Sequence, residues 1–233
     1  MTWNDKVFAY CERGSDPAFW AEPLNAVSNA AFIIAASMAL IEWRRSPRGT
    51  GELLLIATVF VIGIGSFVFH TLATKWARVA DVAPISLFML GYLVFAMRRL
   101  LVLPWAAVAA GLAGFVGAGA GAERITCQSG ACLNGSVGYL PALAAMILVA
   151  GALGWRRHPA TKALATSAAV FALSLVFRSI DMAMCPITLM QPGWRAGTHA
   201  LWHILNALVL YWLLIAAIRG GEAGKRQQKV IGN

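Results

Sequence analysis

The stretch LLLIATVFVIGIGSFVFHTLA, residues 53–73, contains no Lys, Arg, Asp or Glu. A helix needs roughly 20 mainly apolar residues to cross the hydrocarbon core of a bilayer, so this stretch predicts a membrane-spanning helix. The rest of the chain has the same character, because 59% of its 233 residues are hydrophobic and only 12% are charged. A soluble domain of this size cannot bury so much apolar surface, and the composition therefore predicts a polytopic membrane protein.

Six further stretches are long and apolar enough to span a bilayer. They lie at about 23–43, 82–97, 103–122, 135–155, 163–184 and 198–218. The third of the seven spans is short and opens at Asp81. We expect an all-α fold, a single seven-transmembrane helix bundle over residues 1–233, with a basic and disordered tail at 219–233.

The distribution of basic residues predicts the orientation of the bundle. If the chain crosses the membrane seven times, twelve basic residues fall on one side: Arg44, Arg45, Arg48, Arg98, Arg99, Arg156, Arg157, Lys162, Arg219, Lys225, Arg226 and Lys229. Six fall on the other side: Lys6, Arg13, Lys75, Arg78, Arg124 and Arg195. The positive-inside rule places the first group in the cytoplasm, so the N-terminus is expected outside and the C-terminus inside. We interpret the net charge of +9 as a topology signal and expect no nucleic-acid partner.

All four cysteines fall on the predicted outer side: Cys11, Cys127, Cys132 and Cys185. An even number of cysteines in an oxidising compartment favours two disulfides. The simplest pairing joins Cys127 to Cys132 and Cys11 to Cys185. The alternative is four free, buried thiols.

Ionisable side chains inside membrane spans are costly and tend to be functional. The predicted spans and their mouths contain Glu22, His70, Asp81, Arg178, Asp181, His199 and His203. Odd-numbered spans run inward and even-numbered spans run outward, so all these residues lie toward the outer half of the membrane. They come from five different helices, and chance would have scattered them over both leaflets. The pattern predicts one site at this depth.

The histidines favour a metal site. His199 and His203 are four residues apart and therefore project from one face of a helix. His70 is the only other histidine in a predicted span and supplies a third ligand. Three histidines with an open position are typical of catalytic zinc. Ser66 lies one turn before His70, and Asp81 can reach the same place from across a short loop.

Taken singly, each of these residues has a simpler interpretation. A lone histidine in an apolar helix more often packs in the core, and Asp81 by itself fits an N-cap of the third span. Ser66 is a common small packing residue in the close-contact sequence GIGS, residues 63–66. Arg178 and Asp181 suggest a structural ion pair. Their common depth is what favours the metal site.

Four segments carry a resemblance to a known family. They are CERGSDPAFWAEPLNAVSN (11–29), GSFVFHTLATKWARVADVAPI (65–85), DMAMC (181–185) and GTHALWHILNA (197–207). In order and spacing the chain resembles the alkaline ceramidases, within the wider group that includes the progestin and adiponectin receptors. The resemblance implies a seven-helix bundle with zinc on His70, His199 and His203. It also implies hydrolysis of the ceramide amide bond, with Ser66 and Asp81 beside the reacting water.

The same resemblance implies a calcium site near the N-terminus. Glu12 and Glu22 match acidic positions of the family, whereas Ala9 stands where the family has Asp. Asp16 is a candidate replacement ligand, since calcium takes carboxylate and carbonyl oxygens. The alternative is that the two glutamates bind loop backbone or pair with Arg13.

The function expected from the sequence is therefore zinc-dependent cleavage of a ceramide-like lipid that enters from the outer leaflet. The composition suggests a bacterial inner membrane with the site facing the periplasm, and the bundle is a plausible monomer. One alternative is a related hydrolase acting on another lipid amide or ester. The other is a ligand-responsive receptor, for which longer loops or a cytoplasmic domain would be expected.

Overall fold

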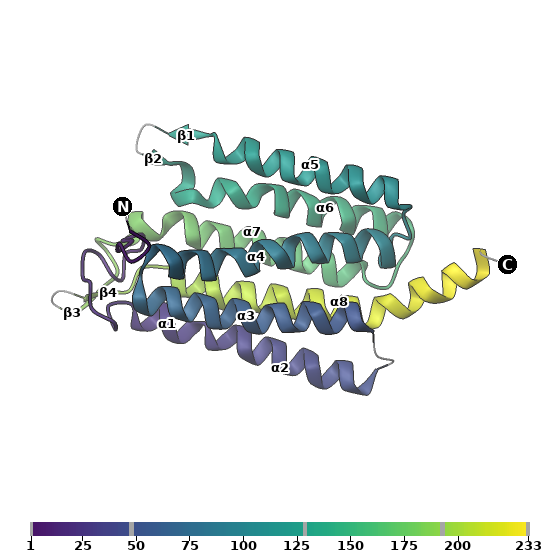
Figure 1. Cartoon of the computed structure of the whole chain (residues 1–233), viewed down its shortest axis with the longest axis horizontal. Helices are drawn as coiled ribbons and strands as arrows, with labels where there is room; N and C mark the ends of the chain where they lie inside the picture. Colours follow the sequence, from purple (N-terminus) through teal and green to yellow (C-terminus); the bar gives the residue numbers. More distant parts are fainter. Residues whose placement is uncertain (1, 47–48, 128–129, 192–193, 232–233) are drawn as a thin grey trace.

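The computed structural model describes residues 2–46, 49–127, 130–191 and 194–231. Its long helices run side by side along one axis, with the N-terminus and the short strands at one end (Figure 1). The helices are α1 (Pro23–Ser28), α2 (Ala30–Arg45), α3 (Thr50–Leu72), α4 (Lys75–Phe95), η1 (Ala96–Leu100), α5 (Trp105–Glu123), η2 (Cys132–Tyr139), α6 (Leu140–Trp155), α7 (Thr161–Met184) and α8 (His199–Ile231).

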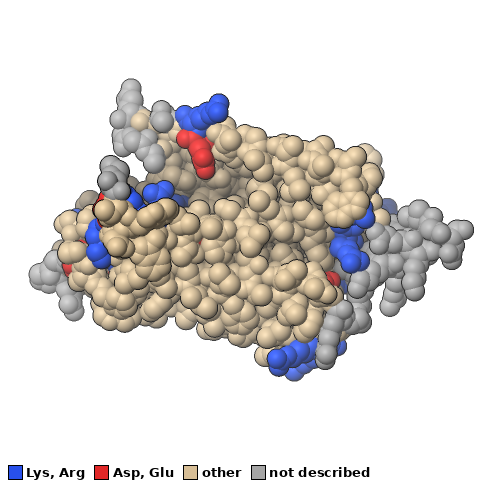
Figure 2. Space-filling model, in the orientation of Figure 1, with Lys and Arg blue, Asp and Glu red and all other residues tan. Residues whose placement is uncertain are grey.

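These helices form seven segments long and apolar enough to cross a membrane. The prediction of a seven-helix bundle is confirmed. Isoleucines and leucines on the outside, such as Leu54 and Leu148, are exposed, as expected of side chains that face lipid. Figure 2 shows that Lys and Arg lie near the two ends of the visible face, with a band free of charge between them. Arg48, which the orientation argument uses, lies outside the described residues.

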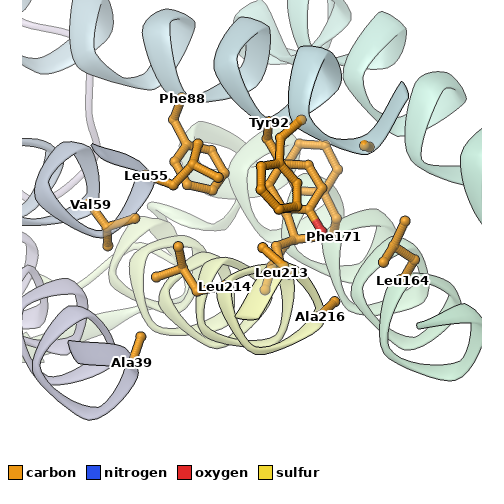
Figure 3. Packing of buried hydrophobic residues seen from close by; sticks show 14 of the residues in the cluster. Ala39, Leu55, Val59, Phe88, Tyr92, Leu164, Phe171, Leu213, Leu214 and Ala216 are labelled. Atoms are coloured by element: carbon orange, nitrogen blue, oxygen red, sulfur yellow. The ribbon is translucent and has the colours of Figure 1, made fainter. Parts of the chain in front are cut away.

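Helix α8 is the centre of the bundle. It contacts α2, α3 and α7, and 56% of its most apolar window is buried, against 11% for α5 at the periphery. Figure 3 shows its Leu213 and Leu214 among Phe88 of α4 and Phe171 of α7. One face of α8 is therefore enclosed by the other helices, which suits a buried site.

The third span begins earlier than the sequence suggested. Helix α4 starts at Lys75, because the hydroxyl of Thr74 caps it by accepting from the backbone N–H of Ala77 at 3.3 Å. Asp81 therefore lies nearly two turns inside the helix and is not its N-cap. Lys75 and Arg78 are charged, so this first part of the helix does not belong to an apolar run and was not predicted.

Helices α3 and α4 form a tight hairpin. A Cβ atom added at Gly65 would lie 2.1 Å from the backbone oxygen of Ala80, so only glycine permits this approach. Ala73 ends α3 in the left-handed conformation, at φ 48°. The close contact brings Ser66 of α3 beside Asp81 of α4.

Both predicted disulfides are present, Cys11–Cys185 and Cys127–Cys132. The first ties the N-terminal arm, residues 2–22, to the end of α7. The second closes the hairpin of β1 (Thr126–Cys127) and β2 (Gly130–Ala131). A second hairpin, β3 (Leu189–Gln191) with β4 (Trp194–Arg195), precedes α8. We call this end of the bundle the disulfide end.

The expectation of a disordered tail is wrong for most of its length. Helix α8 continues to Ile231, well past the end of the predicted span at residue 218. The glycines of this segment suggested disorder, but Ala, Lys, Arg and Gln are good helix formers and extend a helix that the bundle has already nucleated.

Candidate metal centre

Three histidine side chains meet near the disulfide end. His70 comes from the last turn of α3, and His199 and His203 come from the first turns of α8. All three are buried, and one nitrogen from each lies within 4.8 Å of the others. The ring centroids of His199 and His203 are 4.6 Å apart, and those of His70 and His203 are 4.7 Å apart. The predicted meeting of the three rings is confirmed.

The donor atoms of this cluster fit a zinc ion. Among the described residues, His70 Nε2 and His199 Nδ1 are buried without any hydrogen-bond partner. Unpaired polar atoms in an apolar interior are costly, and a shared ion would satisfy them. The second nitrogen of His70 is 2.6 Å from Glu22 Oε2, and Nδ1 of His203 is 2.7 Å from Ser28 Oγ. Such partners orient metal-ligating imidazoles in zinc proteins.

Asp81 of α4 lies near His70 and Ser66 of α3. Both side chains are buried, and the Asp81 carboxyl interacts with the hydroxyl of Ser66. Asp81 Oδ1 has no hydrogen-bond partner among the described residues. A buried carboxyl with an unused oxygen beside a histidine cluster is well placed to exchange protons with a bound molecule.

Asp181 holds the start of α8 in place. Its carboxylate accepts from the backbone N–H groups of Thr198 at 2.7 Å, His199 at 3.0 Å and Cys11 at 2.9 Å. The free N–H groups at a helix start favour such an anion. Gly197 has φ 62° and leaves no room for a side chain, since a Cβ would lie 2.4 Å from Asp181 Oδ1.

The expected Arg178–Asp181 ion pair is therefore wrong. The guanidinium of Arg178 instead lies against the rings of Tyr139 and Trp202, at 5.2 and 5.4 Å from their centroids. It donates to the hydroxyl of Tyr10 at 3.3 Å, and its Nε has no partner within the described part of the chain. The ring of Tyr10 in turn stacks on His199 at 3.8 Å. Arg178 is thus a cation with a spare donor close to the histidines.

The three acidic residues expected to bind calcium do not form a cluster. The histidine group is the single set of metal-competent side chains found within the described ranges. Glu12 accepts from the backbone N–H groups of Leu24 and Asn25 at 2.7 and 2.8 Å. Asp16 is exposed and accepts from the N–H of Ala18. These carboxylates are used locally, and the calcium expectation has no support.

Glu22 has a different role, which sequence reasoning did not assign to it. One oxygen pairs with Nε of Arg13 at 2.5 Å and the other with Nδ1 of His70 at 2.6 Å. Burial alone would raise the pKa of Glu22, but the hydrogen bonds from His70 and Arg13 together hold it below its usual value. The pairing of Glu22 with Arg13 is the alternative that the sequence left open, whereas its contact with His70 spans 48 residues and had no local signal.

An apolar cavity of about 100 Å³ lies in the bundle core next to the histidines. Its walls include Phe32, Phe88, Tyr139, Phe171 and Trp202. The ring of Phe32 is 6.2 Å from that of His203, so the cavity borders the cluster. Walls of this kind suit a hydrocarbon chain.

Comparison with known proteins agrees with this arrangement. The chain matches the model of the ceramidase family over residues 9–231. No curated protein matches the chain. The matched range contains the three histidines, Ser66 and Asp81 as well as all seven membrane-spanning segments. The chain therefore belongs to the ceramidase family.

Proposed function

We propose that the protein is an intramembrane zinc-dependent amidohydrolase that cleaves the N-acyl amide bond of ceramide-like lipids. The products are a fatty acid and a sphingoid base. The observation that carries the proposal is the convergence of His70, His199 and His203 beside Asp81 inside the bundle of a ceramidase-family chain. Water is needed as co-substrate, and the cluster lies near the disulfide end, where water and lipid are both at hand.

Each residue of the site has a separate role in the proposed amide hydrolysis. Zinc, when bound by the three histidines, polarises the amide carbonyl and makes water nucleophilic near neutral pH. Asp81 takes a proton from the attacking water and later delivers it to the leaving amine. The hydroxyl of Ser66 donates to the oxygen of the carbonyl as negative charge develops there. Glu22 and Ser28 keep His70 and His203 in the tautomer that leaves the other nitrogen free.

The surroundings of the cluster suit a lipid substrate. The apolar cavity, whose wall residue Phe32 lies next to His203, would take the start of the acyl chain. Exposed Leu and Ile side chains on the bundle face the lipid from which the substrate comes. Arg178 lies against Tyr139 and Trp202 of the cavity wall, and its unused Nε offers a hydrogen bond to polar groups near the amide. An active site inside the membrane lets the substrate enter sideways without leaving the bilayer.

The orientation from the positive-inside rule completes the proposal. It places the disulfide end outside the cytoplasm, facing the periplasm of a bacterium. Both disulfides and the metal centre lie at that end, and an oxidising compartment is where disulfides persist.

The test is hydrolysis of ceramide by the purified protein, with release of fatty acid as the signal. We expect Asp81→Asn to lower kcat by about 10²–10⁴-fold while zinc content is unchanged, because only the proton acceptor is lost. Ser66→Ala should lower kcat by a smaller factor. Arg195→Gln, a change on the exposed hairpin before α8, serves as the matched control and should retain activity.

Three outcomes are informative. Cleavage by the wild type with loss in Asp81→Asn supports the proposal. Bound zinc without ceramide cleavage would move the search to another lipid amide or ester and overturn the substrate assignment. Full activity in Asp81→Asn would overturn the role given to that carboxyl.

A further inference from the structure

Arg13 is a buried cation surrounded by oxygen atoms. Its side chain has a relative exposure of 0%. It donates from Nε to Glu22 Oε1 (2.5 Å), from Nη1 to the backbone oxygens of Asp16 (3.1 Å) and Ala18 (2.9 Å), and from Nη2 to those of His70 (2.8 Å) and Thr71 (3.4 Å). A guanidinium has five N–H donors. All five are used, so the group is completely satisfied.

This shell has the composition of a hard-cation site. One carboxylate and four backbone carbonyls are the oxygen ligands that proteins offer to calcium. Here these oxygen atoms surround the guanidinium of Arg13 instead of a metal ion. The nearby carboxylates that a divalent ion would need are engaged, because Glu12 binds backbone N–H groups and Glu22 is shared between Arg13 and His70.

The shell joins three parts of the chain. Asp16 and Ala18 belong to the N-terminal arm, Glu22 leads into α1, and His70 and Thr71 end α3. Arg13 holds His70 twice, directly through its backbone oxygen and indirectly through Glu22, which bonds to its Nδ1. The position of one expected metal ligand therefore depends on a side chain that does not touch the metal.

We infer that Arg13 is a built-in cation that takes the place of calcium in this chain. The protein accordingly needs no calcium for stability or activity. Arg13 is a positioning residue for the metal centre and acts through Glu22 on His70. The positioning role of Arg13 rests on the proposed zinc function, whereas the replacement of calcium by Arg13 does not.

The first experiment compares thermal unfolding of the purified wild type in EGTA and in millimolar calcium chloride. We expect the same midpoint in both, within the error of the measurement. A calcium-induced rise of several degrees would overturn the inference, because it would reveal a calcium site that Arg13 does not replace.

The second experiment measures zinc affinity by competition with a chelator. Loss of a partner that orients a metal-ligating histidine costs about 10–100-fold in metal affinity, and we expect this loss in Arg13→Met. Arg13→Lys keeps the charge and should recover part of it. Arg124→Met, at an exposed arginine of the same end, is the matched control and should leave zinc affinity unchanged.

A double variant separates positioning from general damage to the arm. If Arg13 acts through Glu22, Arg13→Met combined with Glu22→Gln should lose no more zinc affinity than the weaker-binding single variant. Losses that multiply would show independent effects and overturn the positioning role. Circular dichroism checks that each variant is folded. If Arg13→Met does not fold, Arg13→Lys with Glu22→Gln provides the same comparison.

The two proposals fail in different ways. A wild type without zinc would contradict the proposed function, yet the calcium comparison would still test whether Arg13 replaces that ion. A wild type that binds zinc and responds to calcium would leave the hydrolase standing and remove the inference.

Discussion

At the scale of single residues, the site is built from side chains whose partners lie far away in sequence. His70 meets Glu22 from 48 residues away, and Cys11 donates to Asp181 across 170 residues. The sequence predicted the three histidines, Ser66 and Asp81 because the membrane makes each polar residue conspicuous and topology places them at one depth. It left the pairing of Glu22 with Arg13 open as an alternative. It could not predict the partners of Arg178 and Asp181, because the choice among several partners depends on side-chain packing.

Glu12 provides a prediction about pH. Burial raises the pKa of its carboxyl to about 7 from an ordinary value of 4.5. The folded state then binds the proton more tightly than the unfolded state, so this group's contribution to stability is complete below about pH 4.5 and is lost as the pH rises through 7. The melting temperature of the wild type should fall over this interval more steeply than that of Glu12→Gln. Equal slopes in scans between pH 4.5 and 7.5 would contradict the raised pKa.

At the scale of the elements, the apolar runs predicted which helices exist, and capping and packing decided where they begin and end. Seven spans follow from hydropathy alone because the bilayer requires about 20 apolar residues in each. The start of α4 at Lys75 was missed, since helix outside the hydrocarbon core needs no apolar residues. The extension of α8 to Ile231 was missed because the glycines of that segment suggested disorder.

The α3–α4 hairpin provides a prediction about packing. Gly65→Ala should destabilise the protein by about 1–3 kcal/mol, because its Cβ would collide with the backbone oxygen of Ala80 and push the helices apart. It should also lower activity, since Ser66 and Asp81 would separate. Thermal unfolding and ceramide hydrolysis measure the two effects. Gly117→Ala on α5 is the control, because a Cβ there meets nothing within 4 Å, and it should be neutral or slightly stabilising.

At the scale of the whole molecule, the bundle places a polar cluster at one end of an apolar body. The N-terminal arm closes this end, held by Cys11–Cys185 and by the ion pair of Asp5 with Lys75 at 2.8 Å. The central helix α8 carries two of the three histidines, so the part of the fold that is most enclosed also carries the site. Composition was enough to predict the class and the span number, but not the covering of the site by the arm. The orientation expected from the basic residues stays a prediction.

The orientation can be tested with reporters fused to the C-terminus in a bacterial host. We expect a green fluorescent protein fusion to fluoresce and an alkaline phosphatase fusion to be inactive, because the positive-inside rule predicts a cytoplasmic C-terminus. The opposite pair of signals would place the disulfide end and the histidines on the cytoplasmic side and contradict the proposed topology.

The central claim is that three histidines hold one zinc ion, and elemental analysis of the purified protein tests it most directly. The account predicts about one zinc per wild-type chain, loss of that zinc in His70→Ala and in His199→Ala, and retention in His158→Ala, whose imidazole lies outside the cluster. A wild type without zinc, or equal zinc in all four proteins, would contradict it.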